Sequence, residues 1–161
     1  MISESIQKYF FLSTESGDGN SRKESLQRAL ERAGLANPDM HLHSRSMLVK
    51  DTCVYHGKGQ RIFAQPLAVC FVSITSNLPG QTISASIGAG IPDQDNSPII
   101  VESHSGLCSE DEAALELERL IKRSSLELNI NLRQILVKAT QHRVITCGAV
   151  VAFCPFFRKG M

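Results

Sequence analysis

The stretch Leu67-Ala68-Val69-Cys70-Phe71-Val72 is apolar at every position. A strand with one solvent-exposed face alternates apolar and polar residues, so an unbroken apolar run indicates a strand that is covered on both faces. This run lies in a predicted strand over residues 61–76. Five more segments rich in Val, Ile and Phe are predicted to be strands: 40–49, 82–91, 98–104, 134–140 and 144–153.

Two amphipathic helices are predicted beside these strands. Each begins at a capping box of the form S-x-x-E, at Ser21 and at Ser109. Apolar residues follow at helical spacing: Leu26, Ala29, Leu30 and Ala33 in the first, and Ala113, Leu117, Leu120, Ile121 and Leu128 in the second. Two helices with about six strands favour an α+β fold, in which two packed, mostly antiparallel sheets carry the helices outside in four αββα layers.

The amino-acid composition limits the classes of function that the chain can have. The chain has 161 residues, of which 42% are hydrophobic and 20% charged, and its 17 Lys and Arg nearly balance 16 Asp and Glu. We expect one domain over residues 1–161, with about 70% of the unfolded chain's surface buried. A net charge of +1 gives no strong field to attract nucleic acid or anionic membranes, so neither is expected as a partner.

The expected location is the cytoplasm. The first nine residues are polar and unlike a signal peptide, and the apolar runs around 67–74 and 145–157 are too short or too interrupted to cross a bilayer. The five cysteines contain no C-x-x-C pair and are expected to be reduced and structural.

Local motifs leave two chemistries open. No P-loop, nucleophile elbow or zinc-protease motif is present, and Gly88-Ala89-Gly90 late in a strand indicates close approach of backbone or of a neighbouring subunit. On two predicted strands, His41 with His43 and Glu102 with His104 each share a face, because alternate residues of a strand point the same way. If those strands were neighbours, the four side chains would suit Zn or Fe(II), giving a metal-dependent enzyme as one alternative.

Several segments, in order, resemble the pyruvoyl-dependent arginine decarboxylase family. The motif Pro79-Gly80-Gln81-Thr82-Ile83-Ser84-Ala85-Ser86-Ile87 is similar to the family's P-G-E-T-I-S-A-x-I. Further similar segments are Ala29-Leu30, Ala33-Gly34-Leu35-Ala36-Asn37, Gly90-Ile91-Pro92, Ile99-Ile100-Val101-Glu102, Gly106-Leu107-Cys108-Ser109 with Glu112-Ala113, Gln141-His142-Arg143-Val144 and Cys147-Gly148-Ala149. The resemblance covers nearly the whole chain.

The resemblance implies a cofactor made from the chain itself. The family's cleavage site matches Arg45-Ser46-Met47-Leu48, so Ser46 would attack the carbonyl of Arg45 and become a pyruvoyl group. The products would be chains of 45 and 116 residues. The pyruvoyl ketone would form a Schiff base with the substrate amine and act as electron sink for decarboxylation.

The resemblance also implies the substrate and the other site residues. Glu102 matches the family's catalytic Glu and would protonate the α-carbon, which requires a raised pKa. Gln27 stands where the family uses an Asp to meet the substrate guanidinium, and Glu24 and Glu31, three and four residues away on the same helix face, could substitute for it. Met40 stands where the family has an Asn that assists self-processing.

The resemblance implies arginine to agmatine as the leading reaction, with no metal at the site. It also implies that the chain assembles as homotrimers or dimers of trimers, with active sites between subunits. Three alternatives remain besides this reaction. They are a paralogue acting on another amino acid, an uncleaved non-catalytic homologue, and the metal enzyme described above.

Overall fold

The computed structural model describes residues 7–35, 43–55 and 67–158, which form ten strands and two helices. Their order is β1 (Lys8–Phe10), β2 (Ser13–Gly19), α1 (Arg22–Ala33), β3 (His43–Ser44), β4 (Ser46–Val49), β5 (Thr52–Val54), β6 (Ala68–Ser76), β7 (Thr82–Pro92), β8 (Ile99–Gly106), α2 (Glu110–Glu127), β9 (Leu132–Arg143) and β10 (Cys147–Arg158).

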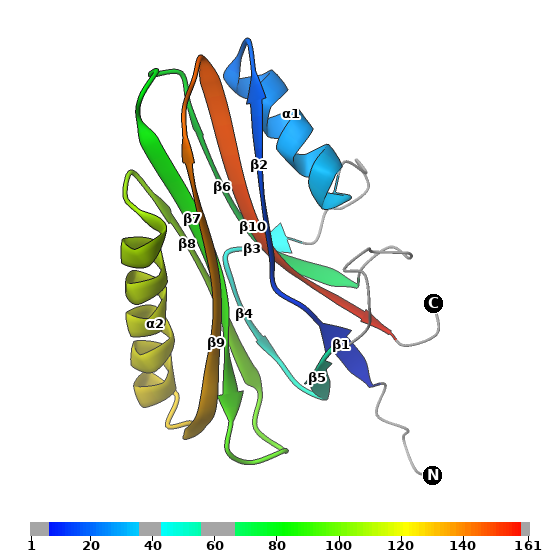
Figure 1. Cartoon of the computed structure of the whole chain (residues 1–161). Coiled ribbons are helices and arrows are strands. Elements are labelled where there is room, and N and C mark those ends of the chain that lie inside the picture. The colour runs from blue at the N-terminus through cyan, green and yellow to red at the C-terminus, as the bar shows by residue number, and fades with distance from the viewer. Residues whose placement is uncertain (1–6, 36–42, 56–66, 159–161) are drawn as a thin grey trace.

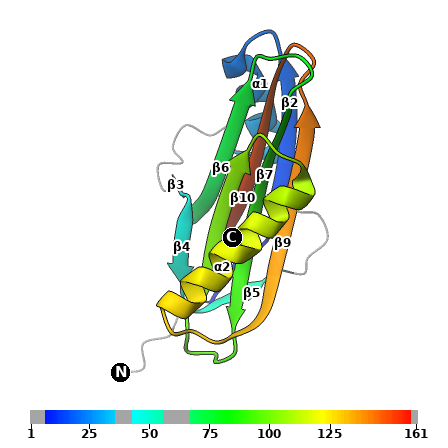
Figure 2. The ribbon, with the colours of Figure 1, turned by 90° about the vertical axis from the view of Figure 1, so that its left-hand side faces the viewer.

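The strands form two sheets that pack face to face (Figure 1). The first sheet has the order β3-β6-β10-β1-β5, with β2 also paired to β10, and the second has the order β4-β8-β7-β9. Only the short pairs β1/β5 and β3/β6 are parallel among the described strands. Helix α1 lies outside the first sheet, and α2 runs across the outer face of the second (Figure 2). The predicted αββα sandwich is confirmed.

The space between the sheets is filled by apolar side chains. Fully buried examples from both sheets are Phe10, Cys70, Ile83, Ile87, Val101, Val150 and Phe156. A second cluster, which includes Ala29, Val151 and Phe153, lies between the first sheet and α1. Strands β7 and β10 are buried on both faces because each has the other sheet on one side and a helix on the other, which explains why residues 83–92 and 147–156 are buried at every position.

Both helices begin at the predicted caps. The Ser21 hydroxyl accepts a hydrogen bond from the Glu24 amide at 3.0 Å, and the Ser109 hydroxyl accepts one from the Glu112 amide at 3.2 Å. Ala113, Leu117 and Ile121 of α2 are fully buried against the second sheet, as predicted. Leu128 was predicted wrongly: it is the residue that caps the C-terminus of α2, and 45% of it is exposed.

Strands β1, β2 and β5 were missed by the sequence analysis, and β2 shows why. Its sequence Ser13-Thr14-Glu15-Ser16-Gly17-Asp18-Gly19 has no apolar alternation, and it is held by pairing with β10 along its whole length. A Cβ atom at Gly17 would lie 2.5 Å from the Ser25 carbonyl oxygen and 2.7 Å from the Ala29 amide nitrogen. Glycine therefore lets α1 pack directly on this strand.

Two further expectations concern segments 40–49 and 61–76. Residues 40–42 and 61–66 lie outside the described residues, and the remainder of 61–76 forms β6, as predicted. The remainder of 40–49 is not one strand, because β3 and β4 belong to different sheets. Within the described ranges, no helix is long and apolar enough to span a membrane.

Candidate active site

The chain crosses from one sheet to the other at Arg45. Ser44 pairs with Cys70 of β6 in the first sheet, and Ser46 pairs with Glu102 of β8 in the second. Arg45 forms the bend between them. The Arg45–Ser46 peptide bond therefore lies where backbone pairing with the first sheet ends and pairing with the second begins.

Ser46 and Glu102 are directly opposite each other on antiparallel strands. Side chains in such pairs point to the same face of the sheet, with Cβ atoms about 4.5–5.5 Å apart. That face is the one covered by α2, because the Ser124 hydroxyl on α2 donates a hydrogen bond to Glu102 Oε1 at 3.0 Å. Ser46 is exposed and Glu102 is half-buried. A hydroxyl open to solvent thus faces a carboxyl that the helix partly shields.

The environment of Glu102 suits a proton donor. Burial raises the pKa of its carboxyl above the ordinary value, and the hydrogen bond from Ser124 acts in the opposite direction by stabilising the charged form. The net direction is upward. A carboxyl with a raised pKa holds its proton closer to neutral pH, which is what general acid catalysis requires.

Two serine side chains hold the peptide group between Arg45 and Ser46. The Ser103 hydroxyl donates a hydrogen bond to the Arg45 carbonyl oxygen at 2.6 Å. The Ser44 hydroxyl accepts a hydrogen bond from the Ser46 amide at 3.4 Å and donates one to the Ser46 carbonyl oxygen at 2.9 Å. Both the carbonyl and the amide of this peptide group therefore have side-chain partners.

Ser103 and Ser124 were not singled out by the sequence analysis. The alternation of β8 does contain a signal for Ser103: the residue next to Glu102 must point to the opposite face, toward the first sheet. Ser103 is 6% exposed there, and its side chain also hydrogen-bonds the Cys70 side chain. No local pattern marks Ser124, whose partner is 22 positions away in the chain.

Gly88 sets the distance between α2 and the second sheet. It pairs with Glu102 across β7 and β8, and a Cβ atom here would lie 2.8 Å from Leu117 Cδ2 and 2.9 Å from Ile121 Cδ1, both on α2. The expectation that residues 88–90 permit close approach of backbone is confirmed by the Leu136 carbonyl oxygen, 2.8 Å from the same Cβ position, and α2 approaches through its side chains. The same close packing brings α2 near enough for Ser124 to reach Glu102.

The predicted substrate-binding residues lie elsewhere in the chain. Gln27 and Glu31 are exposed on α1, where Gln27 Nε2 donates a hydrogen bond to Glu31 Oε1 at 3.4 Å. Helix α1 covers the first sheet and α2 covers the second (Figure 1). Ser46 and Glu102 lie on the face of the second sheet that α2 covers. A single chain therefore brings Ser46 and Glu102 together but leaves Gln27 and Glu31 on the opposite outer side of the sandwich.

The alternative metal site is not assembled in the described part of the chain. Among residues 7–35, 43–55 and 67–158, no group of three or more His, Cys, Asp or Glu side chains is placed to hold a metal ion. His41 and Met40 lie outside these residues, while Glu102 and His104 share one face of β8.

The cysteines are free thiols, and two of them face each other in the core. Cys70 and Cys154 pair across β6 and β10 and are both fully buried. Burial, aided by the charge of Glu102, raises the pKa of Cys70 to about 12, and burial raises the pKa of Cys154 well above its ordinary value. Thiols that stay protonated are poor nucleophiles, which agrees with a structural role.

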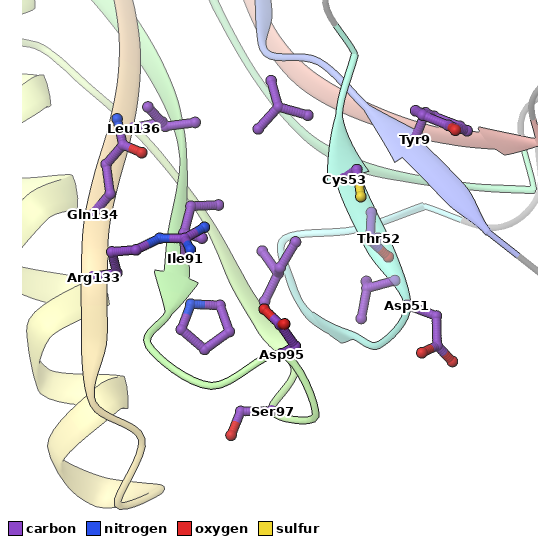
Figure 3. A pocket seen from close by; sticks show the side chains of 14 residues that line it. Tyr9, Asp51, Thr52, Cys53, Ile91, Asp95, Ser97, Arg133, Gln134 and Leu136 are labelled. Atoms are coloured by element: carbon purple, nitrogen blue, oxygen red, sulfur yellow. The ribbon is translucent and has the colours of Figure 1, made fainter. Parts of the chain in front are cut away.

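A pocket of about 610 Å³ opens at one end of the sandwich (Figure 3). Its lining comes from both sheets and includes Asp51, Asp95 and Arg133 around apolar side chains such as Ile91. Val49 and Ile99 also line it, and they are a cross-strand pair three residues along β4 from the Ser46–Glu102 pair. At about 3.3 Å per residue, the pocket lies roughly 10 Å from Ser46, which is not among its lining residues.

The fold and site define an α+β sandwich in which a half-buried carboxyl of raised pKa lies opposite an exposed serine at a sheet crossing. Residues 9–160 match the family model of pyruvoyl-dependent arginine decarboxylase. A relative of that name from Thermococcus kodakarensis is 23% identical over 160 residues, which is 96% of this chain and all of the relative. The chain therefore belongs to the pyruvoyl-dependent arginine decarboxylase family, whose members are carboxy-lyases.

Proposed function

We propose that this chain cleaves itself between Arg45 and Ser46, converts Ser46 to a pyruvoyl group, and decarboxylates L-arginine to agmatine. The observation that carries the proposal is the placement of the Arg45–Ser46 bond at the sheet crossing, with Ser46 exposed directly opposite Glu102. These residues fit the group, because the serine is accessible and the carbonyl before it already accepts a hydrogen bond from Ser103.

Cleavage follows from the chemistry of one serine and one peptide bond. The Ser46 hydroxyl oxygen adds to the Arg45 carbonyl carbon, the amide C–N bond breaks, and the nitrogen takes the hydroxyl proton, which leaves an ester. Loss of the Ser46 α-proton then breaks the Cβ–O bond, freeing the Arg45 carboxylate and leaving a dehydroalanine. Water hydrolyses the imine tautomer of that residue and releases ammonia, so one water is consumed and one ammonia is formed.

In the finished enzyme the pyruvoyl group supplies the electron sink for loss of CO2. The chain's own side chains supply the proton that replaces CO2 on the substrate. Glu102 holds a proton on its carboxyl and delivers it to the substrate α-carbon after CO2 departs. Ser124 positions that carboxyl through its hydrogen bond to Oε1. Burial raises the pKa of Glu102, which favours the protonated form more than in an ordinary exposed carboxyl.

We also propose that the substrate's side chain is met by α1 of a neighbouring subunit in a trimer, or in a dimer of trimers. The support is geometric, since α1 packs on the first sheet, whereas the Ser46–Glu102 pair lies on the face of the second sheet that α2 covers. Glu31 then supplies the carboxylate for the guanidinium, while Gln27 offers only a neutral amide. A carboxylate binds a guanidinium through charge-assisted hydrogen bonds, which an amide cannot match.

The first experiment is the intact mass of the purified protein under denaturing conditions. We expect chains of 45 and 116 residues, the larger one lighter by one ammonia than simple hydrolysis gives. The Ser46→Ala variant is the matched control and should remain a single chain. A wild-type protein that stays intact after long incubation would contradict the proposed cofactor and favour an uncleaved, non-catalytic homologue. An unmodified serine at the new N-terminus would contradict it as well.

Substrate identity is tested by CO2 release from arginine and from other amino acids. We expect arginine to be preferred, and Gln27→Asp to lower the KM for arginine because it restores a carboxylate on α1. If the cleaved protein releases CO2 only from another amino acid, it is a paralogue with a different substrate. Activity that appears only with added zinc or iron, in an uncleaved protein, would favour the metal enzyme.

The subunit arrangement is tested by mixing two inactive variants. Ser46→Ala removes the reacting group, and Gln27→Arg places a repelling charge on α1. Each variant alone should be inactive toward arginine, whereas co-expression should restore part of the activity because some sites then combine an intact α1 with an intact Ser46. No recovery in verified mixed oligomers would contradict a site shared between subunits.

A further inference from the structure

We propose that Ser103 is a catalytic residue of chain cleavage, with its hydroxyl stabilising the negative charge that develops on the Arg45 carbonyl oxygen when Ser46 attacks. This inference rests on the proposed cleavage at Arg45–Ser46 and assigns one further residue to it.

The geometry is that of a donor already in place before the reaction. The hydroxyl lies 2.6 Å from the Arg45 oxygen, at the short end of the range for O–H···O hydrogen bonds. A hydrogen bond to this oxygen strengthens as the oxygen becomes charged, and a donor held in place stabilises such a charge most strongly where water is excluded. Ser103 is 6% exposed and therefore meets that condition.

The sandwich fixes Ser103 from several sides. Its backbone pairs with Ile87 in the middle of β8 and β7, and its side chain points between the sheets, where it also hydrogen-bonds Cys70. The Arg45 carbonyl comes within its reach because the chain crosses between the sheets at this residue. On the other side of the peptide bond, the Ser44 hydroxyl accepts from the Ser46 amide. The scissile group is therefore held at both of its polar atoms.

Ser103 keeps its own proton throughout the step. As the Ser46 oxygen bonds to the Arg45 carbon, the carbonyl π pair moves onto the oxygen that Ser103 donates to. This electron pair re-forms the C=O double bond when the C–N bond breaks, and the leaving nitrogen takes the proton of the Ser46 hydroxyl. The later elimination and hydrolysis occur at residue 46 and do not need this donor. Loss of Ser103 is therefore expected to slow ester formation in particular.

The test compares Ser103→Thr with Ser103→Val, which have nearly the same shape but differ in the hydroxyl. Freshly purified protein is incubated with hydroxylamine, which splits an ester as it forms, and release of the 45-residue chain is followed by mass. We expect the Thr variant to remain within about tenfold of wild type and the Val variant to be slower by about 10²–10³-fold, the usual effect of losing one such donor. Ser103→Ala adds no bulk and should be slowed like Val.

Ser105→Ala is the matched control, because Ser105 lies on the same face of β8 but pairs with Ala85, away from the crossing. Circular dichroism establishes that each variant is folded. A folded Val or Ala variant that releases the fragment at the wild-type rate would overturn the role of Ser103 and leave the proposed function standing. A wild-type chain that never splits, with or without hydroxylamine, would remove both proposals.

Discussion

Gly88→Ala tests whether the close packing of α2 on the second sheet supports the site. The added Cβ atom would lie 2.8 Å from Leu117 Cδ2 and 2.8 Å from the Leu136 carbonyl oxygen, where ordinary contact begins at 3.4 Å. The leucine methyl group can rotate away at some cost. The Leu136 oxygen belongs to β9, which is paired with β7 along its length, and so cannot move alone. The strain must therefore be relieved by moving α2 outward or by distorting β7.

Overpacking of this kind costs about 1–3 kcal/mol. For a chain of 161 residues this corresponds to a fall of roughly 2–12 °C in the apparent Tm. Outward movement of α2 also lengthens the hydrogen bond from Ser124 to Glu102. We therefore expect kcat to fall together with stability. The assays are thermal unfolding at a fixed protein concentration and steady-state decarboxylation at a temperature where the variant is fully folded.

Gly106→Ala is the matched control within the same sheet. Its nearest neighbours would be Cys108 Sγ at 3.4 Å and His104 Nε2 at 3.5 Å, which are ordinary contacts with side-chain atoms. We expect an effect within about 0.5 kcal/mol, typical of unstrained surface changes. Equal Tm values for the two variants would refute the packing argument. A destabilised Gly88→Ala protein with unchanged kcat would show that the position of α2 does not control Glu102.

Two further predictions concern the pKa of Glu102. Its raised pKa means that the folded chain binds a proton more tightly than the unfolded chain, so this group's contribution to stability is lost as pH rises from the ordinary value of 4.5 through the raised value. The comparison is made in an uncleaved Ser46→Ala background, with and without Glu102→Gln. The Tm of the Gln variant should rise relative to that of its parent as pH increases through this window. A Tm difference that stays constant with pH would contradict the prediction. Ser124→Ala removes a hydrogen bond that lowers this pKa, so the alkaline fall of kcat should move to higher pH.

The fold could be predicted where the sequence pattern reports local packing. Strands β6 to β10 were identifiable because their segments are rich in apolar and β-branched residues between turn signals. Both helices were identifiable because Ser21 and Ser109 cap them in the expected way. Strand β2 could not be predicted, since its polar residues and glycines are held by β10 and α1. The crossing at Arg45 could not be predicted either, because the residues on both sides of it satisfy the pattern of one continuous strand.

The site was predictable only in part for a similar reason. The roles of Arg45 and Ser46 in cleavage and of Glu102 in catalysis entered through the family resemblance, and the structure places Ser46 opposite Glu102. The partners of these residues depend on contacts between distant segments, such as the 58 positions that separate Ser103 from Arg45. The sequence around a serine does not indicate which oxygen atom its hydroxyl will hydrogen-bond. Folding, rather than the motif, determines which hydroxyls hold the scissile group.

Cleavage at the crossing should not release the smaller chain, because each side of the break is anchored separately. The residues before it include β1 and β2, which pair with β10, and α1, which packs on the first sheet. The residues after it continue directly into β4, which pairs with β8. Phe10 of the smaller chain is fully buried in the shared core, and a Phe→Ala change at such a position typically costs 3–5 kcal/mol. We therefore expect both chains to co-elute in native size-exclusion chromatography and to separate only under denaturing conditions. Free 45-residue chain in the native eluate would show that β1, β2 and α1 bind the rest of the fold more weakly than their buried contacts imply.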